Sequence, residues 1–390
     1  MEEDFWLWPG QADDDPQPDG QRMNTFTHAR QQAQLSFIAS AENIVVGDSR
    51  HCPMAPEKLM QLSSSDPCVV ECFDGGLTAQ VLHLCIDGRH YTLKQKRREA
   101  LVRNTDGQTS FLNEVQRRAD FTRLKNDPLW AGRFDHIVPT IYGNFRQGII
   151  LSPWLPGHSP EKVDEDLFEQ VLSTLMACEE AGLMEWDLCP GNLLMDNGHL
   201  WLFDFGYMYP FQPLQSYNSN GLQDPLFHAC ERFETRFFFG RLLEENQPEA
   251  VQLSQYHALK TLALKHYRHK REKLASQGAD AAVLVWLDAI ITSWQQALRD
   301  NQSLQRGFTI EAFRSHVLDV EDDLHGQSCT PLTLKRIEYI TQSIQSCYEV
   351  LNEGGALFYD NKGKSQRALL AQYQRKRQLA CDAMQPQYKR

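Results

Sequence analysis

The sequence predicts an α+β fold in which a small β-rich lobe precedes a larger helical lobe. Between residues 66 and 155, apolar residues come in short strand-like runs around one amphipathic helix. After Pro156-Gly157, apolar residues recur every three or four positions over long segments, which is the spacing of helices. We therefore predict four segments: an acidic, partly disordered N-terminal segment (1–65), a β-rich lobe (66–155), a helical lobe (156–325) and a helical C-terminal extension with a basic tail (326–390).

The N-terminal segment is rich in residues that disfavour regular structure. Residues 1–22 contain seven Asp or Glu together with several Pro and Gly. Such a composition cannot bury enough apolar surface to offset the entropy lost on ordering. We expect a solvated tail here, whereas residues 31–65 give no clear pattern.

The β-rich lobe should contain a hairpin, one main helix and two more strands. Val81–Ile86 and Tyr91–Leu93 flank Asp87-Gly88, a pair that is typical of a tight hairpin turn. Phe111–Leu124 has apolar residues at helical spacing. Two further runs have the composition of strands, Ile137–Tyr142 and Gly148–Leu151.

The helical lobe begins with a helix whose apolar face carries Leu167, Val171 and Leu175, and which Gly182 can end. Further helices are predicted over 226–245, 251–275, 280–299 and 332–351. The last 29 residues contain eight Lys or Arg and one acidic residue. A solvated basic helix face is the commoner explanation of such a run, and binding to an anionic partner is the alternative.

Composition and charge disfavour several classes of protein. A net charge of −12 argues against general nucleic-acid binding, which usually needs a basic face. No apolar run reaches the ~18 residues expected of a membrane-spanning helix. The ten cysteines are scattered without paired metal-ligand spacing, as expected for reduced thiols. We expect a cytoplasmic protein without a membrane span.

The most informative segment is 183–206, which places three polar residues at defined intervals. Asp187 and Asn192 stand five residues apart, and Asp204 opens an Asp-Phe-Gly after a short apolar strand. An Asp can orient an attacking hydroxyl, while an Asn and a second Asp can hold Mg²⁺ on a nucleoside triphosphate. Each motif alone is weak, but the three in this order indicate phosphoryl transfer.

In this order and spacing, these residues resemble the protein-kinase-like superfamily over about residues 69–245. Asp187-Leu-Cys-Pro-Gly-Asn192 is similar to the Asp-Leu-His-Pro-Gly-Asn of aminoglycoside-phosphotransferase-type kinases. The resemblance implies a bilobal fold that binds ATP and Mg²⁺. It also implies that Asp187 positions the acceptor hydroxyl and that Asn192 and Asp204 bind the metal.

Two upstream residues extend the resemblance. Tyr91-Thr-Leu-Lys94 resembles Val-Ala-Ile-Lys, which implies that Lys94 contacts the nucleotide phosphates. Glu114, on the helix that follows, is implied to orient Lys94 through an ion pair. Lys96 is the rival cation because strand alternation places it on the same face, but it lies beyond the apolar part of the strand.

The phosphate-covering loop of the family is only partly matched. Residues 74–81 fit Gly-x-Gly-x-x-Gly-x-Val at Gly76 and Val81 alone, because Asp74 and Ala79 replace the outer glycines. Backbone N–H groups can still cover phosphates here, although the carboxylate of Asp74 is unfavourable. Gly76 and Val81 are therefore candidate nucleotide contacts.

The segment Leu151–Gly157 resembles the connection between the lobes, which binds the adenine base in the family. One backbone carbonyl and, two residues later, one backbone N–H are needed there. Pro153 has a carbonyl although it lacks an N–H, and Leu155 keeps its N–H. Pro153 and Leu155 are therefore candidate base contacts.

Three departures from the family bear on the acceptor. Glu185-Trp186 replaces the His-Arg that precedes the catalytic Asp, and Cys189 replaces a Lys that lies near the transferred phosphate. No Ala-Pro-Glu follows the Asp-Phe-Gly. Glu185 either helps to bind a cationic acceptor or braces the loop, and the sequence leaves both roles open.

We therefore predict an ATP- and Mg²⁺-dependent phosphotransferase, an atypical kinase whose acceptor is a hydroxyl of a small molecule or of a protein Ser/Thr. The missing peptide-binding features after Asp204 favour a small or otherwise non-standard acceptor. Two alternatives stay open: a catalytically silent kinase-like scaffold that binds partner proteins, and an AMP transferase on the same fold.

Overall fold

The structure is a computed structural model that describes residues 24–76, 78–102, 104–385 and 388. These residues form two compact units. The sheet unit contains the described chain up to Glu161 together with Ser173–Pro210, and the helical unit contains Lys162–Leu172 together with the chain from Phe211 onward. The predicted α+β class is confirmed, while the acidic stretch 1–22 lies outside the described residues. In this part of the chain, no helix combines enough length with enough apolar character to span a bilayer.

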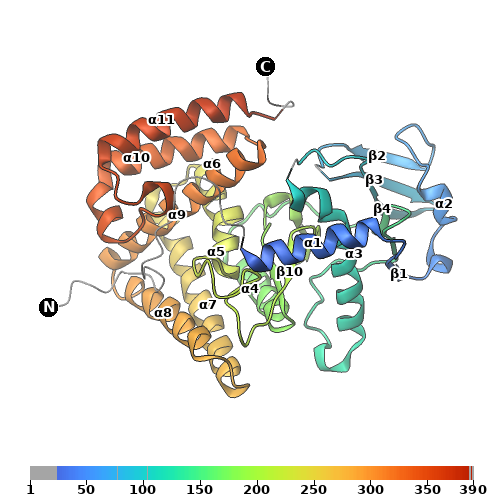
Figure 1. The fold of residues 1–390 in the computed structure, drawn as a ribbon, viewed down its shortest axis with the longest axis horizontal. Coiled ribbons are helices and arrows are strands. Elements are labelled where there is room, and N and C mark those ends of the chain that lie inside the picture. Colours follow the sequence, from blue (N-terminus) through green and yellow to red (C-terminus); the bar gives the residue numbers. More distant parts are fainter. Residues whose placement is uncertain (1–23, 77, 103, 386–387, 389–390) are drawn as a thin grey trace. The chain divides into compact units, whose positions relative to one another are not determined.

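The sheet unit is built on a six-stranded antiparallel sheet in the order β1-β5-β6-β4-β3-β2. Figure 1 labels the strands β1, β2, β3 and β4 of this sheet. Its strands are β1 (Val45–Gly47), β2 (Val69–Phe73), β3 (Ala79–Ile86), β4 (Arg89–Lys96), β5 (Tyr142–Asn144) and β6 (Ile149–Pro153). The predicted hairpin is present as β3 and β4. Asp87 and Gly88 between them have φ of 51° and 72°, the left-handed conformation that a tight hairpin turn of this kind needs.

Apolar side chains cover both faces of this sheet. Three helices contribute them: α1 (Thr25–Ala39), α2 (Pro56–Leu59) and α3 (Thr105–Asn126). On one face, Phe111 and Val115 of α3 belong to a core cluster with Ile150, and apolar residues of α1 pack at its edge. On the other face, Leu59 of α2 belongs to a cluster with Leu82. The strand register places the side chain of residue 94 on the face that α3 covers.

Two short ladders complete the sheet unit. They pair β7 (Leu183–Glu185) with β10 (Met208–Pro210), and β8 (Leu193–Asp196) with β9 (His199–Leu202). Asn197 and Gly198 join β8 to β9 with φ of 49° and 81°, again a turn that favours Asn-Gly. Asp187 therefore lies between β7 and β8, and Asp204 lies between β9 and β10.

The sheet unit differs from the predicted lobe in three places. β1 joins the sheet from within the predicted N-terminal segment. Ile137–Tyr142 is not one strand, because only Tyr142 begins β5 while Ile137 makes a single bridge to Leu202. Ser173–Pro210 belongs to this unit because Asp204 and the carbonyls that follow it are bound to β4 and α3.

After residue 226 the helical unit consists mainly of helices, among them those predicted from the sequence. They are α5 (Ala229–Phe233), a π-helical turn (Glu234–Phe238), α6 (Phe239–Glu245), α7 (Glu249–Ser276), α8 (Ala281–Ala297), α9 (Asn301–Gly326), α10 (Pro331–Glu353) and α11 (Gln366–Asp382). The division between the units falls within α4 (Glu165–Glu180). α9 was not predicted, because every residue from Ala312 to Val320 is buried and the apolar positions therefore show no one-sided period.

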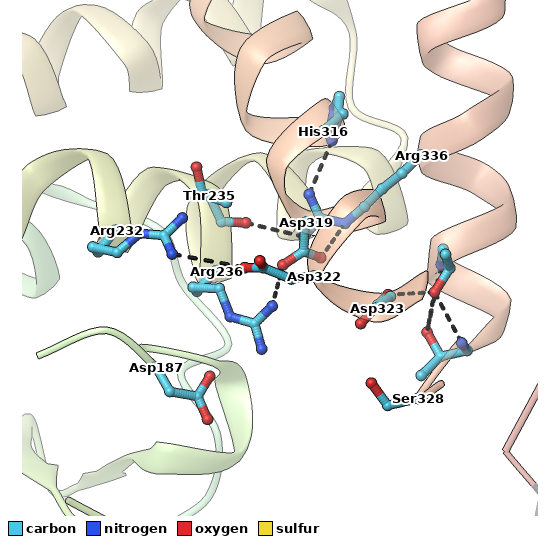
Figure 2. A network of polar contacts seen from close by, with 12 residues as sticks. Asp187, Arg232, Thr235, Arg236, His316, Asp319, Asp322, Asp323, Ser328 and Arg336 are labelled. Atoms are coloured by element: carbon cyan, nitrogen blue, oxygen red, sulfur yellow. Dashed lines mark hydrogen bonds and ion pairs between the residues drawn. The ribbon is translucent and has the colours of Figure 1, made fainter. Parts of the chain in front are cut away.

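A buried polar network joins α9, α10 and the π-helical turn within the helical unit. Figure 2 shows Asp319 between the guanidinium groups of Arg236 and Arg336, with Nε of Arg336 at 2.8 Å from Oδ2 of Asp319. Arg336 also donates to the carbonyl of Thr235 at 3.1 Å and to Nδ1 of His316 at 3.0 Å. These contacts attach the π-helical turn to α9 and α10.

Candidate functional site

Lys94 connects three elements of the sheet unit. Its Nζ is 2.5 Å from Oε2 of Glu114 on α3 and 2.8 Å from Oδ1 of Asp204 after β9. The pair of Lys94 and Glu114 that the sequence predicts is therefore formed. The rival cation, Lys96, makes no ion pair in the described part of the chain, and its Nζ lies 5.1 Å from the centre of the Phe145 ring.

Arg118 is a second buried cation in this cluster, and the sequence did not indicate its role. It is 4% exposed, and its Nη2 is 3.0 Å from Oε1 of Glu114, one helical turn earlier on α3. Its Nη1 lies 3.4 Å from Oγ of Ser152, and its guanidinium lies over the ring of Phe205. Each oxygen of Glu114 thus faces its own cation. The i,i+4 spacing of Glu and Arg was the only sequence signal for this pair.

Asp204 is held in an uncommon backbone conformation and remains charged. Its φ of 64° lies in the left-handed region, which Asp adopts more readily than most residues. Burial disfavours its ionised form, but the ammonium of Lys94 and the guanidinium of Arg118 hold the pKa of the Asp204 carboxyl below its usual value. Burial likewise opposes the charge on Lys94, while Asp204 and Glu114 hold the pKa of the ammonium above its usual value. Both groups are therefore ionised at neutral pH.

The Asp-Phe-Gly segment is fastened to α3 by a buried amide. Nδ2 of Asn113 lies 3.1 Å, 3.0 Å and 2.7 Å from the carbonyl oxygens of Phe205, Gly206 and Met208. A Cβ on Gly206 would come within 3.2 Å of Cβ of Ser110, so the glycine permits this close approach. The sequence did not indicate Asn113, because its acceptors lie far along the chain.

The loop after β7 brings Asp187 and Asn192 together. Nδ2 of Asn192, at the end of the 3₁₀ turn Pro190–Asn192, lies 2.8 Å from the carbonyl oxygen of Asp187 and 3.3 Å from its Oδ2. The carbonyl of Asn192 accepts the N–H of Phe203 at 3.3 Å, one residue before Asp204. The five polar residues singled out in the sequence therefore all lie in the sheet unit.

Arg97 fastens the turn that carries Gly76. Its Nε donates to the carbonyl of Gly76 at 2.8 Å, and its Nη2 donates to the carbonyl and the carboxylate of Asp74 at 2.6 Å and 2.8 Å. Asp74, which was expected to be unfavourable for phosphates, is thus paired with a cation. A Cβ on Gly76 would lie 2.4 Å from the carbonyl oxygen of Ala79, so this turn requires glycine. Val81 follows on β3.

Trp154 separates the two candidate base contacts, Pro153 and Leu155. Pro153 ends β6, and Leu155 follows outside the sheet. The N–H of Trp154 donates to the carbonyl of His90 at 3.2 Å. Its indole stacks on the ring of His83, with 3.6 Å between centroids and 6° between planes. The side chains of His83 and Lys94 lie on the same face of the sheet, so the Trp154 indole covers part of that face.

Glu185 is buried beside the loop of Asp187. Its side chain is on the last residue of β7 and is 5% exposed, and its Oε1 accepts the N–H of Asp187 at 2.7 Å. Burial raises the pKa of the Glu185 carboxyl well above its usual value, and the carboxylates of Asp187 and Asp204 add to this effect. A side chain this deeply buried is not open to a cationic acceptor. Of the two roles that the sequence left open, the geometry favours bracing of the loop.

Comparison with known proteins gives only loose similarities. No protein-family model and no curated protein sequence matches the chain. A 2.2 Å crystal structure of WbdD aligns with a TM-score of 0.29 and 16% identity, covering 54% of this chain and 50% of that chain. A co-crystal structure of WbdD with a kinase inhibitor aligns with a TM-score of 0.33 and 16% identity, covering 60% and 49%. The chain thus spans about half the length of the WbdD chains that it matches.

Proposed function

We propose that this chain is an ATP- and Mg²⁺-dependent phosphotransferase with a protein-kinase-like fold, which transfers the γ-phosphate to a hydroxyl of a small molecule or a protein. The observation that supports this function best is the position of the Lys94 ammonium between Glu114 and Asp204. Phosphoryl transfer by this fold needs a lysine that a helix carboxylate orients, next to the metal-binding Asp of the Asp-Phe-Gly.

The surroundings of each residue suggest its part in the reaction. Lys94 binds phosphate oxygens, and Glu114, itself held by Arg118, fixes the direction of the lysine. Asp187 orients the acceptor hydroxyl and takes up its proton. Asn192 holds the loop of Asp187 through its Nδ2. The rate enhancement comes mainly from positioning and from neutralisation of charge.

The residues present also fit a Mg²⁺ ion bound together with the nucleotide. Nδ2 of Asn192 is engaged with Asp187, and its Oδ1 has no hydrogen-bond partner within the described ranges. The side chain of Asp204 is 36% exposed, which leaves carboxylate oxygen accessible to a ligand. Mg²⁺ prefers oxygen ligands and commonly takes one or two protein groups beside phosphates and waters. A bound Mg²⁺ supplies neutralisation of phosphate charge.

Incubation with ATP labelled in the γ or the α position tests the proposal. Transfer of the γ label, or its release, should require Mg²⁺. Asp187→Ala should keep nucleotide binding and lose turnover by ~10²–10⁴-fold, as for a positioned base. Asp204→Ala should lose Mg²⁺-dependent nucleotide binding. Asp196→Ala, at the far end of β8 from Asn192, is the matched control and should stay active.

Three results would contradict the proposal. Transfer of the α label alone would indicate AMP transfer by the same fold. Absence of both transfers, together with no effect of ATP and Mg²⁺ on the melting temperature, would indicate a silent scaffold. Full activity of Asp187→Ala would show that the catalytic loop is misassigned.

A further inference from the structure

Glu185 is an unusual carboxyl group because it is buried and uses only one of its two oxygens. Oε1 accepts the N–H of Asp187, whereas Oε2 is buried and has no hydrogen-bond partner among the residues that the structure describes. Because β7 pairs with β10, Glu185 lies opposite Met208, in the strand that follows Asp204. Glu185 thus contacts the loop of Asp187 through its side chain and the strand after Asp204 through its backbone pairing.

The surroundings of Glu185 disfavour a negative charge. The titratable groups that act on it or share its surroundings are Asp187 from its own loop, Asp204 before β10, Cys178 and Glu179 from α4, and Tyr209 from β10. None of these is a cation. Three cations lie one group further away, and each is paired with another carboxylate. Arg133 acts on the thiol of Cys178 and is paired with Glu180. Arg30 and Arg117 act on Tyr209 and are paired with Asp106 and Asp120. A buried carboxylate without a cationic partner is costly, so such a group takes up a proton instead.

We propose that Glu185 is a positioning residue that works as a neutral carboxylic acid. Its Oε1 fixes the backbone of Asp187, and a proton on the other oxygen removes charge from the buried group. This role rests on the proposed phosphotransferase function.

The neutral state matters because Glu185 lies so near the reacting groups. A second carboxylate behind Asp187 would add negative charge beside the group that has to orient the acceptor hydroxyl. It would also add negative charge beside Asp204, where nucleotide phosphates have to bind. A protonated acid avoids both effects and still accepts the N–H that holds the loop.

Two substitutions separate positioning from charge. Glu185→Gln keeps an oxygen for the N–H of Asp187 and is always neutral, so kcat and the KM for ATP should stay within about threefold of wild type. Glu185→Ala removes the acceptor, so kcat should fall about 10- to 100-fold while the KM for ATP changes little. Glu71→Gln, exposed on β2, is the matched control for loss of one carboxylate.

Melting temperatures between pH 5 and pH 9 test the protonation state without any need for turnover. The unfolded chain ionises this residue near its ordinary pKa of 4.5, whereas the folded protein keeps the proton to a higher pH. Its contribution to stability is therefore present at low pH and is lost as pH rises toward the folded pKa. The melting temperature of Glu185→Gln should therefore fall less between pH 5 and pH 9 than that of the wild type. Glu71→Gln should show the same fall as the wild type.

The outcomes are distinguishable. If Glu185→Gln lost as much kcat as Glu185→Ala, a charged carboxylate would be required and the inference would fall. It would also fall if Glu185→Ala kept full kcat, or if the melting curves of wild type and Glu185→Gln ran parallel in pH. If the wild type turned over no ATP, the proposed function alone would fail, and the melting temperatures would still decide whether Glu185 is neutral.

Discussion

Removal of the Lys94 ammonium is the most direct test of the buried ion cluster. Lys94→Met keeps the length of the side chain and deletes the charge that Glu114 and Asp204 share. Loss of one partner from a buried ion pair costs roughly 3–5 kcal/mol. The cost should be smaller here, about 2–3 kcal/mol, because Arg118 still pairs with Glu114 at 3.0 Å and the side chain of Asp204 is 36% exposed.

Thermal unfolding measures this cost, with Lys96→Met as the matched control. For a unit of this size, 2–3 kcal/mol corresponds to a fall in Tm of roughly 5–10 °C. Lys96 lies two residues later on the same face and makes no ion pair in the described part of the chain, so Lys96→Met should lower Tm by no more than about 2 °C. ATP turnover should fall by ~10²-fold or more in Lys94→Met alone.

A double-mutant cycle with Glu114→Gln identifies the partner of the ammonium. The double variant should lose less stability than the sum of the two single losses, with a coupling free energy of about 1–3 kcal/mol. Equal melting temperatures for Lys94→Met and Lys96→Met would refute a buried ion pair at Lys94. Unchanged turnover in Lys94→Met would refute its contact with the phosphates.

Three further variants test separate features. Arg97→Ala releases the turn at Gly76, so the KM for ATP should rise about tenfold with little change in Tm, and an unchanged KM would mean that this turn does not contact the nucleotide. Trp154→Ala removes the indole that covers part of the sheet beside the candidate base contacts, so calorimetry should show ATP binding up to ~10-fold tighter. Weaker binding would instead show that the indole is itself part of the base site. Burial and the carboxylate of Asp319 raise the pKa of Asp323 to about 7, so stability should fall as pH rises from about 4 to about 7. Asp323→Asn should lack this decline and be more stable than wild type at pH 8 by up to about 4 kcal/mol, and equal stability of the two proteins at pH 8 would contradict this assignment.

The features that could be predicted from the sequence are those fixed by short-range spacing. The β3–β4 hairpin follows from Asp87-Gly88 between two apolar runs, and the order of its strands places Lys94 on the sheet. Asp187 and Asn192 are close because only five residues and a tight turn separate them. Such groups can be recognised without knowledge of the tertiary fold.

The features that the sequence did not reveal depend on contacts between distant segments. Arg118 and Asn113 look like ordinary polar residues of an amphipathic helix, and only the fold shows that they are buried against Glu114 and the Asp-Phe-Gly segment. The burial of Glu185 is likewise invisible in the sequence, since it arises where β7 pairs with β10. α9 was missed because burial on every side removes the periodic signal.

The buried charges of the sheet unit bear on the choice between an enzyme and a silent scaffold. An ion cluster such as that around Lys94 has a desolvation cost, and its replacement by packed apolar residues is often neutral or stabilising by about 1–4 kcal/mol. Stability alone therefore does not explain the cluster, whereas the proposed binding of nucleotide phosphates would. The unfavourable carboxylate of Asp74 is also paired with Arg97, within the turn that would cover those phosphates. That pairing offsets the one charge in this turn that opposes phosphate binding, in line with the proposed phosphotransferase function.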